Sequence, residues 1–395
     1  MINTMGFSLV MPFVAMHLVE ERGATGAAYG LIYLLSGLFA AAGQGVAGEL
    51  SDRVGRRAVM LSGLATRSLN MIALGVAVSV EAPIWVIGSL VVLNGLLRAQ
   101  FEPAAGAAVT ELSPPHLRVA AFGLQRIGMN LGWAVGPALG GFLSTHSYGT
   151  MFFVAAPATL IAIFAVLPLG KGSPAPRRKR RERLTFAQAA AALREHRVFA
   201  VYLVLVLVAT ILTVQIFATL SVYGSVHLGL EKIDFGLLYS VNGVMVVAAQ
   251  VPAVALARRV GMRRALVFGA LSYTAGYLLF GAATGFGHLA FGMVVITVGE
   301  VIFAPALTDT AAALGDPERM GRAFGLFGLA QSLGISLGPI VGGLGFDLLR
   351  DEPSRLWLLL AGAMLVVGIA YSVFGRLTGA FERMETRTEA AAQSG

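Results

Sequence analysis

The chain has 395 residues, of which 56% are hydrophobic and 13% are charged. A soluble domain usually has about a quarter of its residues charged, because its surface faces water, so this composition excludes an ordinary soluble protein. Apolar runs recur along the sequence, and at roughly 20 residues each is long enough to cross a bilayer as a helix. Ten-residue stretches of alternating polarity do not occur, which excludes a transmembrane barrel. We therefore expect an all-α membrane protein.

Residues that carry metal or covalent chemistry are scarce. The chain has no cysteine, so it cannot form a disulfide, a thiolate metal site or a cysteine nucleophile. None of the six histidines has another histidine three or four residues away, the spacing of a helical metal site. The sequence shows no nucleophile–base pair and no nucleotide-binding loop of the form G-x-x-x-x-G-K-S/T. We expect neither an enzyme nor a metal or other cofactor.

The apolar runs predict twelve membrane-spanning helices. The first run has no charged residue before it, which leads us to expect that the natural chain starts further upstream. It lacks the positively charged start and the cleavage site of a signal peptide, so we interpret it as a spanning helix. In chain order the expected spans are 1–20, 25–49, 58–80, 84–110, 119–144, 149–170, 199–226, 235–257, 265–284, 286–311, 322–347 and 355–376.

Basic residues between the spans predict the orientation. Lys and Arg collect in the cytoplasmic loops of membrane proteins. Of the 29 basic residues only four lie in the loops of one side, and most of the others lie in the opposite loops and the tail. We therefore expect both termini in the cytoplasm, in a multi-pass protein of the cell inner membrane. The net charge of +8 is then a topology signal, and we expect no nucleic-acid partner.

The longest polar stretch, residues 171–198, divides the chain into halves of similar length. Its five consecutive basic residues, 177–181, predict a cytoplasmic linker attracted to anionic membrane lipid. Residues 185–197 can form a short helix on the membrane surface. The expected parts are an amino-terminal six-helix bundle (1–170), the linker (171–198), a carboxyl-terminal six-helix bundle (199–376) and a cytoplasmic tail (377–395), in a monomeric protein.

The two halves repeat each other. The run 53–59 recurs at 259–266 with one residue inserted, and the run 121–124 recurs at 323–326. A glycine–proline pattern of span five recurs without gaps in span eleven, which indicates a duplication. Because each copy has six helices, both copies insert the same way up. This is the parallel repeat of transporters whose two pseudo-symmetric bundles rock about a central cavity.

The loop between spans two and three carries a compact motif of glycine and charge. It resembles the signature loop of the major facilitator superfamily at every defining position, which are Gly48, Asp52, Arg53, Gly55, Arg56 and Arg57. Asp52 ends span two, where the dipole of its own helix disfavours a negative charge, so it needs another partner. The resemblance implies that the partner is span eleven and that the contact latches the cytoplasmic side shut. The alternative is a topology anchor without a gating role.

The second copy of this loop departs from the pattern. Arg258 stands where the first copy has Asp52, and Val254 stands where it has Gly48. An equivalent latch in the second half is therefore not expected, and gating should be asymmetric.

Span five contains a run of small residues around a proline, which are Gly132, Gly136, Pro137, Gly140 and Gly141. This run looks like the motif of the antiporter branch of the same superfamily, and the resemblance implies export by exchange. Glycines four residues apart leave a smooth helix face, and the proline permits a bend. Ordinary glycine-mediated helix packing is the alternative, because span eleven repeats the pattern.

Four ionisable side chains within spans are candidates for proton coupling, because such groups are costly in a membrane unless they have a function. They are Arg98 and Glu102 on span four, and Glu300 and Asp309 on span ten. Arg98 and Glu102 are four residues apart, so they share a helix face. Glu300 corresponds to Arg98 in the repeat, and we expect the two to face each other across the cavity. Glu300 is the preferred proton carrier, and a fixed structural network is the alternative.

Other polar side chains within the spans are candidates to line the cavity, with interhelical hydrogen bonding as the alternative for each. They are Asn94, Gln125, Arg126, Asn130, Gln215, Asn242 and Gln250. Arg67 lies two to three turns into span three, and we expect it to snorkel toward the cytoplasmic face.

Together these features favour secondary active transport. The resemblance implies a twelve-helix drug:proton antiporter that exports small apolar or amphipathic compounds by alternating access, with the compound and protons as its partners. One alternative is a transporter of a specific metabolite such as a sugar, an amino acid, a siderophore or a lysolipid. Another is a membrane sensor that keeps the fold without moving a substrate.

Overall fold

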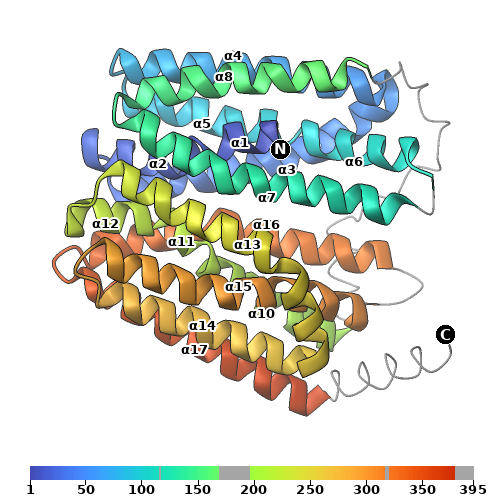
Figure 1. Ribbon diagram of the computed structural model, residues 1–395, viewed down its shortest axis with the longest axis vertical. Coiled ribbons are helices and arrows are strands. Elements are labelled where there is room, and N and C mark those ends of the chain that lie inside the picture. Colours follow the sequence, from blue (N-terminus) through green and yellow to red (C-terminus); the bar gives the residue numbers. More distant parts are fainter. Residues whose placement is uncertain (115–116, 169–195, 316–319, 379–395) are drawn as a thin grey trace. The chain divides into compact units, whose positions relative to one another are not determined.

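The computed structural model describes residues 1–114, 117–168, 196–315 and 320–378, and the regular structure in these ranges is helical (Figure 1). Each of the twelve predicted spans contains helix. The first six spans contain α1 (Ile2–Ser8), α2 (Met11–Met16), the π-helix η1 (His17–Glu21), α3 (Gly26–Val54), α4 (Arg56–Ser79), α5 (Ile84–Arg98), α6 (Phe101–Leu112), α7 (Arg118–Ser144) and α8 (Tyr148–Val166). The last six contain α10 (Arg197–Thr213), α11 (Gln215–Ala218), α12 (Leu220–Leu228), α13 (Lys232–Val260), α14 (Met262–Gly281), α15 (Phe286–Leu314), α16 (Met320–Leu348) and α17 (Pro353–Thr378).

Ten helical segments of the described chain are long and apolar enough to cross a membrane. The remaining two predicted spans are α7 and α14, which are helices of 27 and 20 residues. Both contain charged side chains, since α7 carries Arg126 among its glycines and α14 begins beside two arginines. Each packs against spanning helices, α7 on α1 and α8, and α14 on α15 and α17. The twelve-helix prediction therefore matches the helices of the structure.

Three predicted spans are interrupted, although we expected continuous helices. Span four stops at Arg98 and resumes at Phe101. Pro103, in the first turn of α6, has no N–H to offer the Ala99 carbonyl, and its ring crowds that oxygen. Span one is divided into α1, α2 and η1, and Pro12 lies in the first turn of α2. Span seven is divided into α10, α11 and α12.

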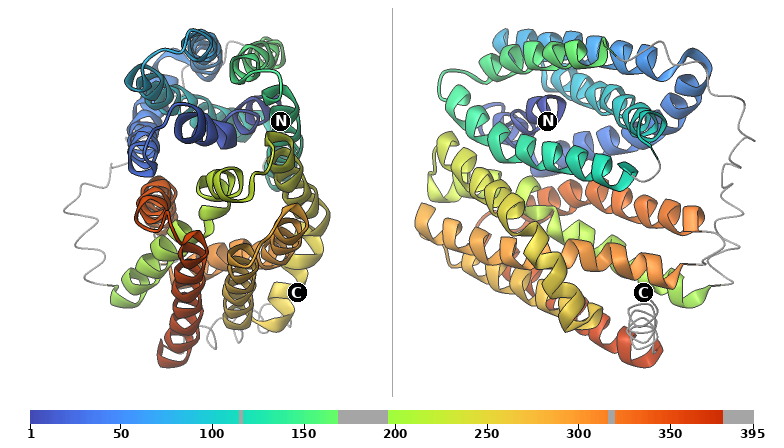
Figure 2. Two further views of the ribbon diagram at one scale, coloured as in Figure 1. Left: turned by 90° about the vertical axis from the view of Figure 1, so that its left-hand side faces the viewer. Right: turned by 45° about the vertical axis from the view of Figure 1, so that its right-hand side comes forward.

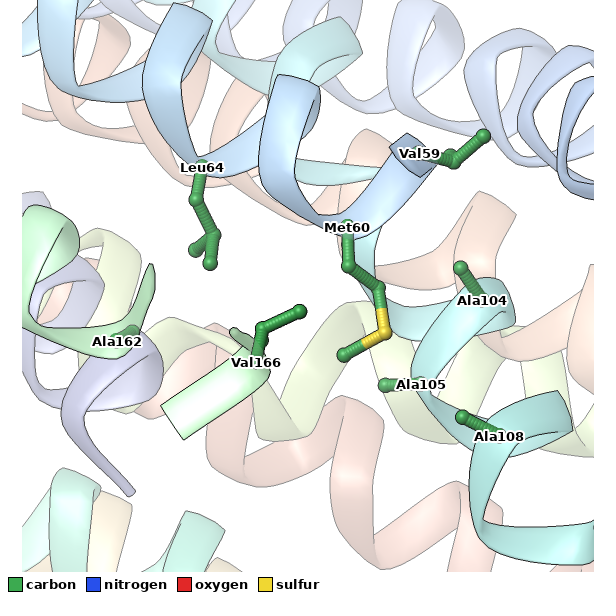
Figure 3. Packing of buried hydrophobic residues seen from close by; sticks show 8 residues of the cluster. All are labelled: Val59, Met60, Leu64, Ala104, Ala105, Ala108, Ala162 and Val166. Carbon is green, nitrogen blue, oxygen red and sulfur yellow. The ribbon is translucent and has the colours of Figure 1, made fainter. Parts of the chain in front are cut away.

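Residue contacts divide the chain into two units, which we describe separately. The first unit comprises Met1–Arg181, Gln215–Val247 and Ser336–Leu348, so helices of the second half of the sequence contribute to it. In this unit α4 and α8 lie side by side (Figure 1). Where α6 joins them, Met60 extends from α4 toward Ala105 of α6 and Val166 of α8 (Figure 3). Such close van der Waals packing holds membrane helices together, because lipid is as apolar as the side chain itself.

The second unit comprises Glu182–Val214, Ala248–Ile335 and Leu349–Gly395. Within it α14 packs against α15 and α17, which lie beside it in each view (Figure 2). Two buried tyrosines tie α10 to this group by donating hydrogen bonds to backbone carbonyls. Tyr202 donates to the Leu307 carbonyl on α15, and Tyr277 of α14 donates to the Leu212 carbonyl. These bonds satisfy hydroxyl groups that would otherwise be costly in an apolar interior.

The same tight connection occurs once in each half of the sequence. Gly55 alone joins α3 to α4 with φ of 94°, and Gly261 alone joins α13 to α14 with φ of 87°. Only glycine adopts this left-handed backbone without a steric cost, so both turns depend on it. The shared geometry agrees with the predicted alignment of the two repeats.

Candidate functional site

The glycines of span five form one face of α7 that receives span one. Gly132, Gly136 and Gly140 are spaced four residues apart, and a side chain added at any of them would collide with α1 or the Leu9 backbone beyond it. Ser8 uses this closeness to donate a 2.8 Å hydrogen bond to the Gly132 carbonyl. The motif therefore brings two backbones into contact, which is what small residues do between membrane helices.

The matching glycines of α16 receive span seven in the same manner. A side chain at Gly334 would meet Thr210 of α10, and one at Gly342 would meet Thr219. The Gly338 carbonyl accepts a 3.0 Å hydrogen bond from Gln215 Nε2. Gln215 is fully buried in this interhelical contact. The duplicated motif thus makes duplicated contacts, α7 with span one and α16 with span seven.

A second face of each glycine helix joins helices from opposite halves of the sequence within the first unit. A side chain at Gly141 of α7 would lie 2.9 Å from the Lys232 carbonyl and 3.0 Å from the Gly236 Cα, both on α13. On α16, a side chain at Gly343 would collide even more closely with the Gly26 backbone of α3. Neither contact leaves room for a larger residue, so these helices are held together by backbone packing.

An aspartate completes the contact between α16 and α3. The two Asp347 oxygens each accept a 2.8 Å hydrogen bond, one from Gly26 N and one from Ala27 N. These amides belong to the first turn of α3, which has no partner within its own helix, and the positive end of the helix dipole favours an anion there. Asp347 was not among the predicted residues. Asp347 lies near the carboxyl end of span eleven, where the dipole of its own helix disfavours a negative charge. The same argument identified Asp52 in the sequence and could have identified Asp347.

Further polar contacts surround this end of the first unit. Lys232 of α13 forms a 2.9 Å ion pair with Glu21 and lies 3.9 Å from the centre of the Tyr148 ring. Tyr29 of α3 donates a 2.9 Å hydrogen bond to the Ala218 carbonyl, which connects spans two and seven. Helices of both sequence halves are therefore joined here by charge, hydrogen bonds and close packing.

In the signature loop, Arg56 ties the start of α4 to the end of α6. Its Nε and Nη2 atoms each lie 3.1 Å from Glu111 Oε1, and its Nη1 donates a 2.6 Å hydrogen bond to Ser51. Arg53 is exposed. The surroundings of Gly48 and Asp52 lie outside what the structure describes, so the cytoplasmic latch stays a prediction.

Arg98 and Glu102 form an ion pair of 3.7 Å across the break between α5 and α6. The expected closeness is present, although the two residues belong to different helices. Their side chains are 34% and 48% exposed, so both reach the surface of the first unit. The Arg98 guanidinium also lies 4.6 Å from the centre of the Phe7 ring on α1, a favourable cation–π distance.

Arg67 does not snorkel to the cytoplasmic face, which corrects the prediction. Its residue is only 2% exposed, and its Nε donates a 3.3 Å hydrogen bond to Asn94 Oδ1. Its Nη1 donates to the Asn3 side chain, and its guanidinium lies 5.8 Å from the Phe7 ring. Two guanidinium groups thus flank one aromatic ring. Sequence reasoning missed this arrangement, because Asn3 and Phe7 lie on α1, far from Arg67 along the chain.

Aromatic side chains continue from this ring through the first unit. Phe7 meets Trp133 of α7 at 6.0 Å between ring centres, Trp133 meets Phe217 of α11 at 5.3 Å, and Phe217 meets Tyr239 of α13 at 5.4 Å. We call Phe7, Trp133, Phe217 and Tyr239 the aromatic row. The first three are partly exposed, and sequence reasoning did not place Trp133, Phe217 and Tyr239 beside Phe7.

The acids of span ten lie in the second unit. Glu300 is partly buried on α15 and interacts electrostatically with Tyr273 and Tyr277 of α14. Asp309 is partly buried near Tyr202. Because Arg98 belongs to the other unit, its expected pairing with Glu300 stays a prediction.

The remaining cavity candidates differ in exposure. Asn94 and Asn242 are buried, Gln125, Asn130 and Gln250 are intermediate, and Arg126 is exposed. In the described residues no group of three or more metal-binding side chains occurs.

The duplicated helices and their glycine contacts define a multi-pass helical membrane protein with an internal repeat. A sequence model of the Major Facilitator Superfamily matches residues 1–339 and, in a second match, residues 217–385. The chain therefore belongs to the Major Facilitator Superfamily, and it is a membrane transporter.

Curated relatives and solved structures agree with this family. The chain is similar to the uncharacterized MFS-type transporter YqjV of Bacillus subtilis (strain 168), with 25% identity covering 97% of this chain and 92% of YqjV. It is also similar to multidrug resistance protein 1 of the same organism, with 24% identity covering 93% of this chain and 92% of that protein. The fold matches that of the nucleoside transporter NupG with a TM-score of 0.77 at 14% identity, covering 94% and 96% of the two chains.

Proposed function

We propose that the protein is a proton-coupled antiporter of the cell inner membrane that exports small apolar or amphipathic compounds such as drugs. The observation that carries the proposal is the Arg98–Glu102 ion pair inside a membrane-spanning segment. Ionisable groups at such positions mark substrate and proton pathways, because their burial is otherwise costly. The relative named multidrug resistance protein 1 supports the class of substrate.

The proton gradient supplies the energy in this proposal. A proton that moves across 100 mV releases about 2.3 kcal/mol, enough for roughly a fifty-fold concentration ratio of a neutral compound. Glu102 already has a cation beside it, so we assign proton loading to Glu300 and expect Arg98 to exchange partners between them. Asp309 is a second candidate on the same helix.

Alternating access follows from rocking of the bundles 1–170 and 199–376 about the substrate. With both termini in the cytoplasm, the Asp347 contact lies on the outer side and the signature loop on the inner side. In this scheme Asp347 holds the outer side closed when the inner side is open, and Asp52 does the reverse. The linker 171–198, most of which lies outside the described residues, would bind anionic lipid beside a monomeric transporter.

The test is transport by purified protein in proteoliposomes, with a panel of lipophilic dyes and drugs and an imposed pH gradient. Wild type is compared with Glu300→Gln and with Glu352→Gln, a matched change at an exposed loop position. We expect gradient-dependent flux of several unrelated compounds, lost in the first variant and kept in the second. Flux of one compound class alone would favour a metabolite transporter, and an absence of flux in all proteins would refute transport of these compounds.

A further inference from the structure

Within the part of the chain that the structure describes, the buried Arg67 forms hydrogen bonds but no ion pair. Its hydrogen-bond partners in the described chain are Asn94 and Asn3, which are both neutral. Its Nη2 atom is buried and has no hydrogen-bond partner among the residues that the structure describes, and the same holds for the neighbouring Asn94 Nδ2. Both are donors. A buried cation held only by neutral groups is costly, so this pair of donors is suited to an acceptor that carries negative charge.

The single carboxylate of Glu102 is not enough to neutralise the two guanidinium groups of this region. Arg67 and Arg98 both lie beside the Phe7 ring, whereas among the described residues the ion pair that either of them forms is the one between Arg98 and Glu102. Two cations therefore stand against one anion. Since Arg98 is about one-third exposed and lies at 3.7 Å from Glu102, the longer end of an ion pair, a second carboxylate can reach its guanidinium.

The aromatic row gives the other half of a binding site. It begins at Phe7, the ring that the two guanidinium groups flank, and continues through the partly exposed Trp133 and Phe217. Aromatic faces of this kind stack with flat apolar ligands, which gain about 0.5–1.5 kcal/mol for each ring pair beyond area burial. Positive charge lies at one end of the row and apolar surface along it.

We propose that this arrangement is a binding site for amphipathic aromatic anions, whose carboxylate is held by Arg67 and Arg98 and whose ring stacks on the aromatic row. The inference rests on the proposed function and narrows it, since it assigns anions to the first unit as a preferred class of exported compound. Glu102 competes with the ligand carboxylate for Arg98, so the ligand binds more weakly while the Arg98–Glu102 ion pair is intact.

The experiment uses two probes with the same ring and different charge, 2-naphthoate and 2-naphthamide. Binding of each to the purified full-length protein is measured by isothermal titration calorimetry. A charged hydrogen bond contributes enough free energy to change affinity by about ten- to a hundredfold. We expect wild type to prefer the carboxylate by such a factor, Arg98→Gln to lose the preference, and Glu102→Gln to bind the carboxylate more tightly.

Controls keep the result interpretable. Arg376→Gln removes the same charge at an exposed position on α17 and should keep the preference. Arg67→Lys retains the buried charge and should keep part of the preference for the carboxylate, whereas Arg67→Gln should lose that preference. Thermal melting shows whether each variant folds. Equal binding of the two probes to wild type, or a preference unchanged in Arg98→Gln, would overturn the proposal.

Failure of this site is distinguishable from failure of the proposed function. If neutral and cationic dyes are transported while naphthoate shows no preference, the anion site is wrong and drug efflux stands. If naphthoate binds with the expected preference but no compound moves under a pH gradient, the site stands and proton-driven efflux is wrong.

Discussion

Replacing Asp347 by asparagine should release the contact between α16 and α3. The aspartate accepts two hydrogen bonds of 2.8 Å from the first turn of α3. Asparagine keeps one acceptor oxygen but loses the negative charge, so one bond and the attraction to the helix dipole are removed. Charged hydrogen bonds contribute about 1.5–3 kcal/mol, and partial exposure reduces the effect, so we take about 2 kcal/mol. That corresponds to a shift of about thirtyfold in the ratio of outer-open to outer-closed protein.

The absence of native cysteine allows this shift to be measured with a single introduced thiol. Ser221 is a suitable reporter because it is fully buried on α12, where its hydroxyl donates a 3.3 Å hydrogen bond to the Pro12 carbonyl. Ser221→Cys should react slowly with a membrane-impermeant thiol reagent added from the outside. Adding Asp347→Asn should raise that rate by about thirtyfold as long as the open form remains rare.

The matched control is Asp351→Asn, an exposed aspartate four residues further along the chain. It removes the same charge without removing a helix cap, so the reaction rate should stay within about twofold of the rate of the Ser221→Cys protein. A rate for the Asp347 variant equal to that of this control, in protein with an unchanged melting temperature, would refute the reasoning.

Two further predictions concern packing. Gly141→Ala would place a methyl group 3.0 Å from the Gly236 Cα, and because backbone cannot move aside cheaply we expect a loss of about 1–3 kcal/mol, seen as a lower melting temperature. Gly123→Ala, which meets nothing within 4 Å, should keep or slightly raise the melting temperature, because alanine favours a helix more than glycine does, and equal behaviour of the two variants would contradict the packing argument. Met60→Ala leaves a cavity where the side chain packs against Ala105 and should lower the free energy of unfolding by about 2–5 kcal/mol. A loss below about 1 kcal/mol would show that the helices move together and fill the cavity.

Hydrophobic length and repetition predicted the fold well, because a membrane leaves few ways to satisfy a backbone. Helix ends were within a few residues, apart from α3, which continues to Val54 beyond its predicted end at 49. The break in span four was not predictable from Pro103 alone, since Pro305, its counterpart in the repeat, lies inside the uninterrupted helix α15.

The contacts of the site were less accessible to sequence reasoning. The Arg98–Glu102 pair was expected because its partners are four residues apart. Arg67 was misjudged because its position in span three suggested a reach to water, whereas its partners Asn3 and Asn94 lie on other helices. Such distant polar matches depend on how helices rotate and tilt, which periodicity alone does not determine.

Coupled flux in a single vesicle preparation tests the central claim most directly. Proteoliposomes containing the wild-type protein and an internal pH dye are given a lipophilic drug, first with and then without an imposed pH gradient. We expect the drug to accumulate only with the gradient, and an outward drug gradient to drive protons in the opposite direction. Drug accumulation that ignores the gradient, or drug movement with no change in internal pH, would contradict proton-coupled antiport.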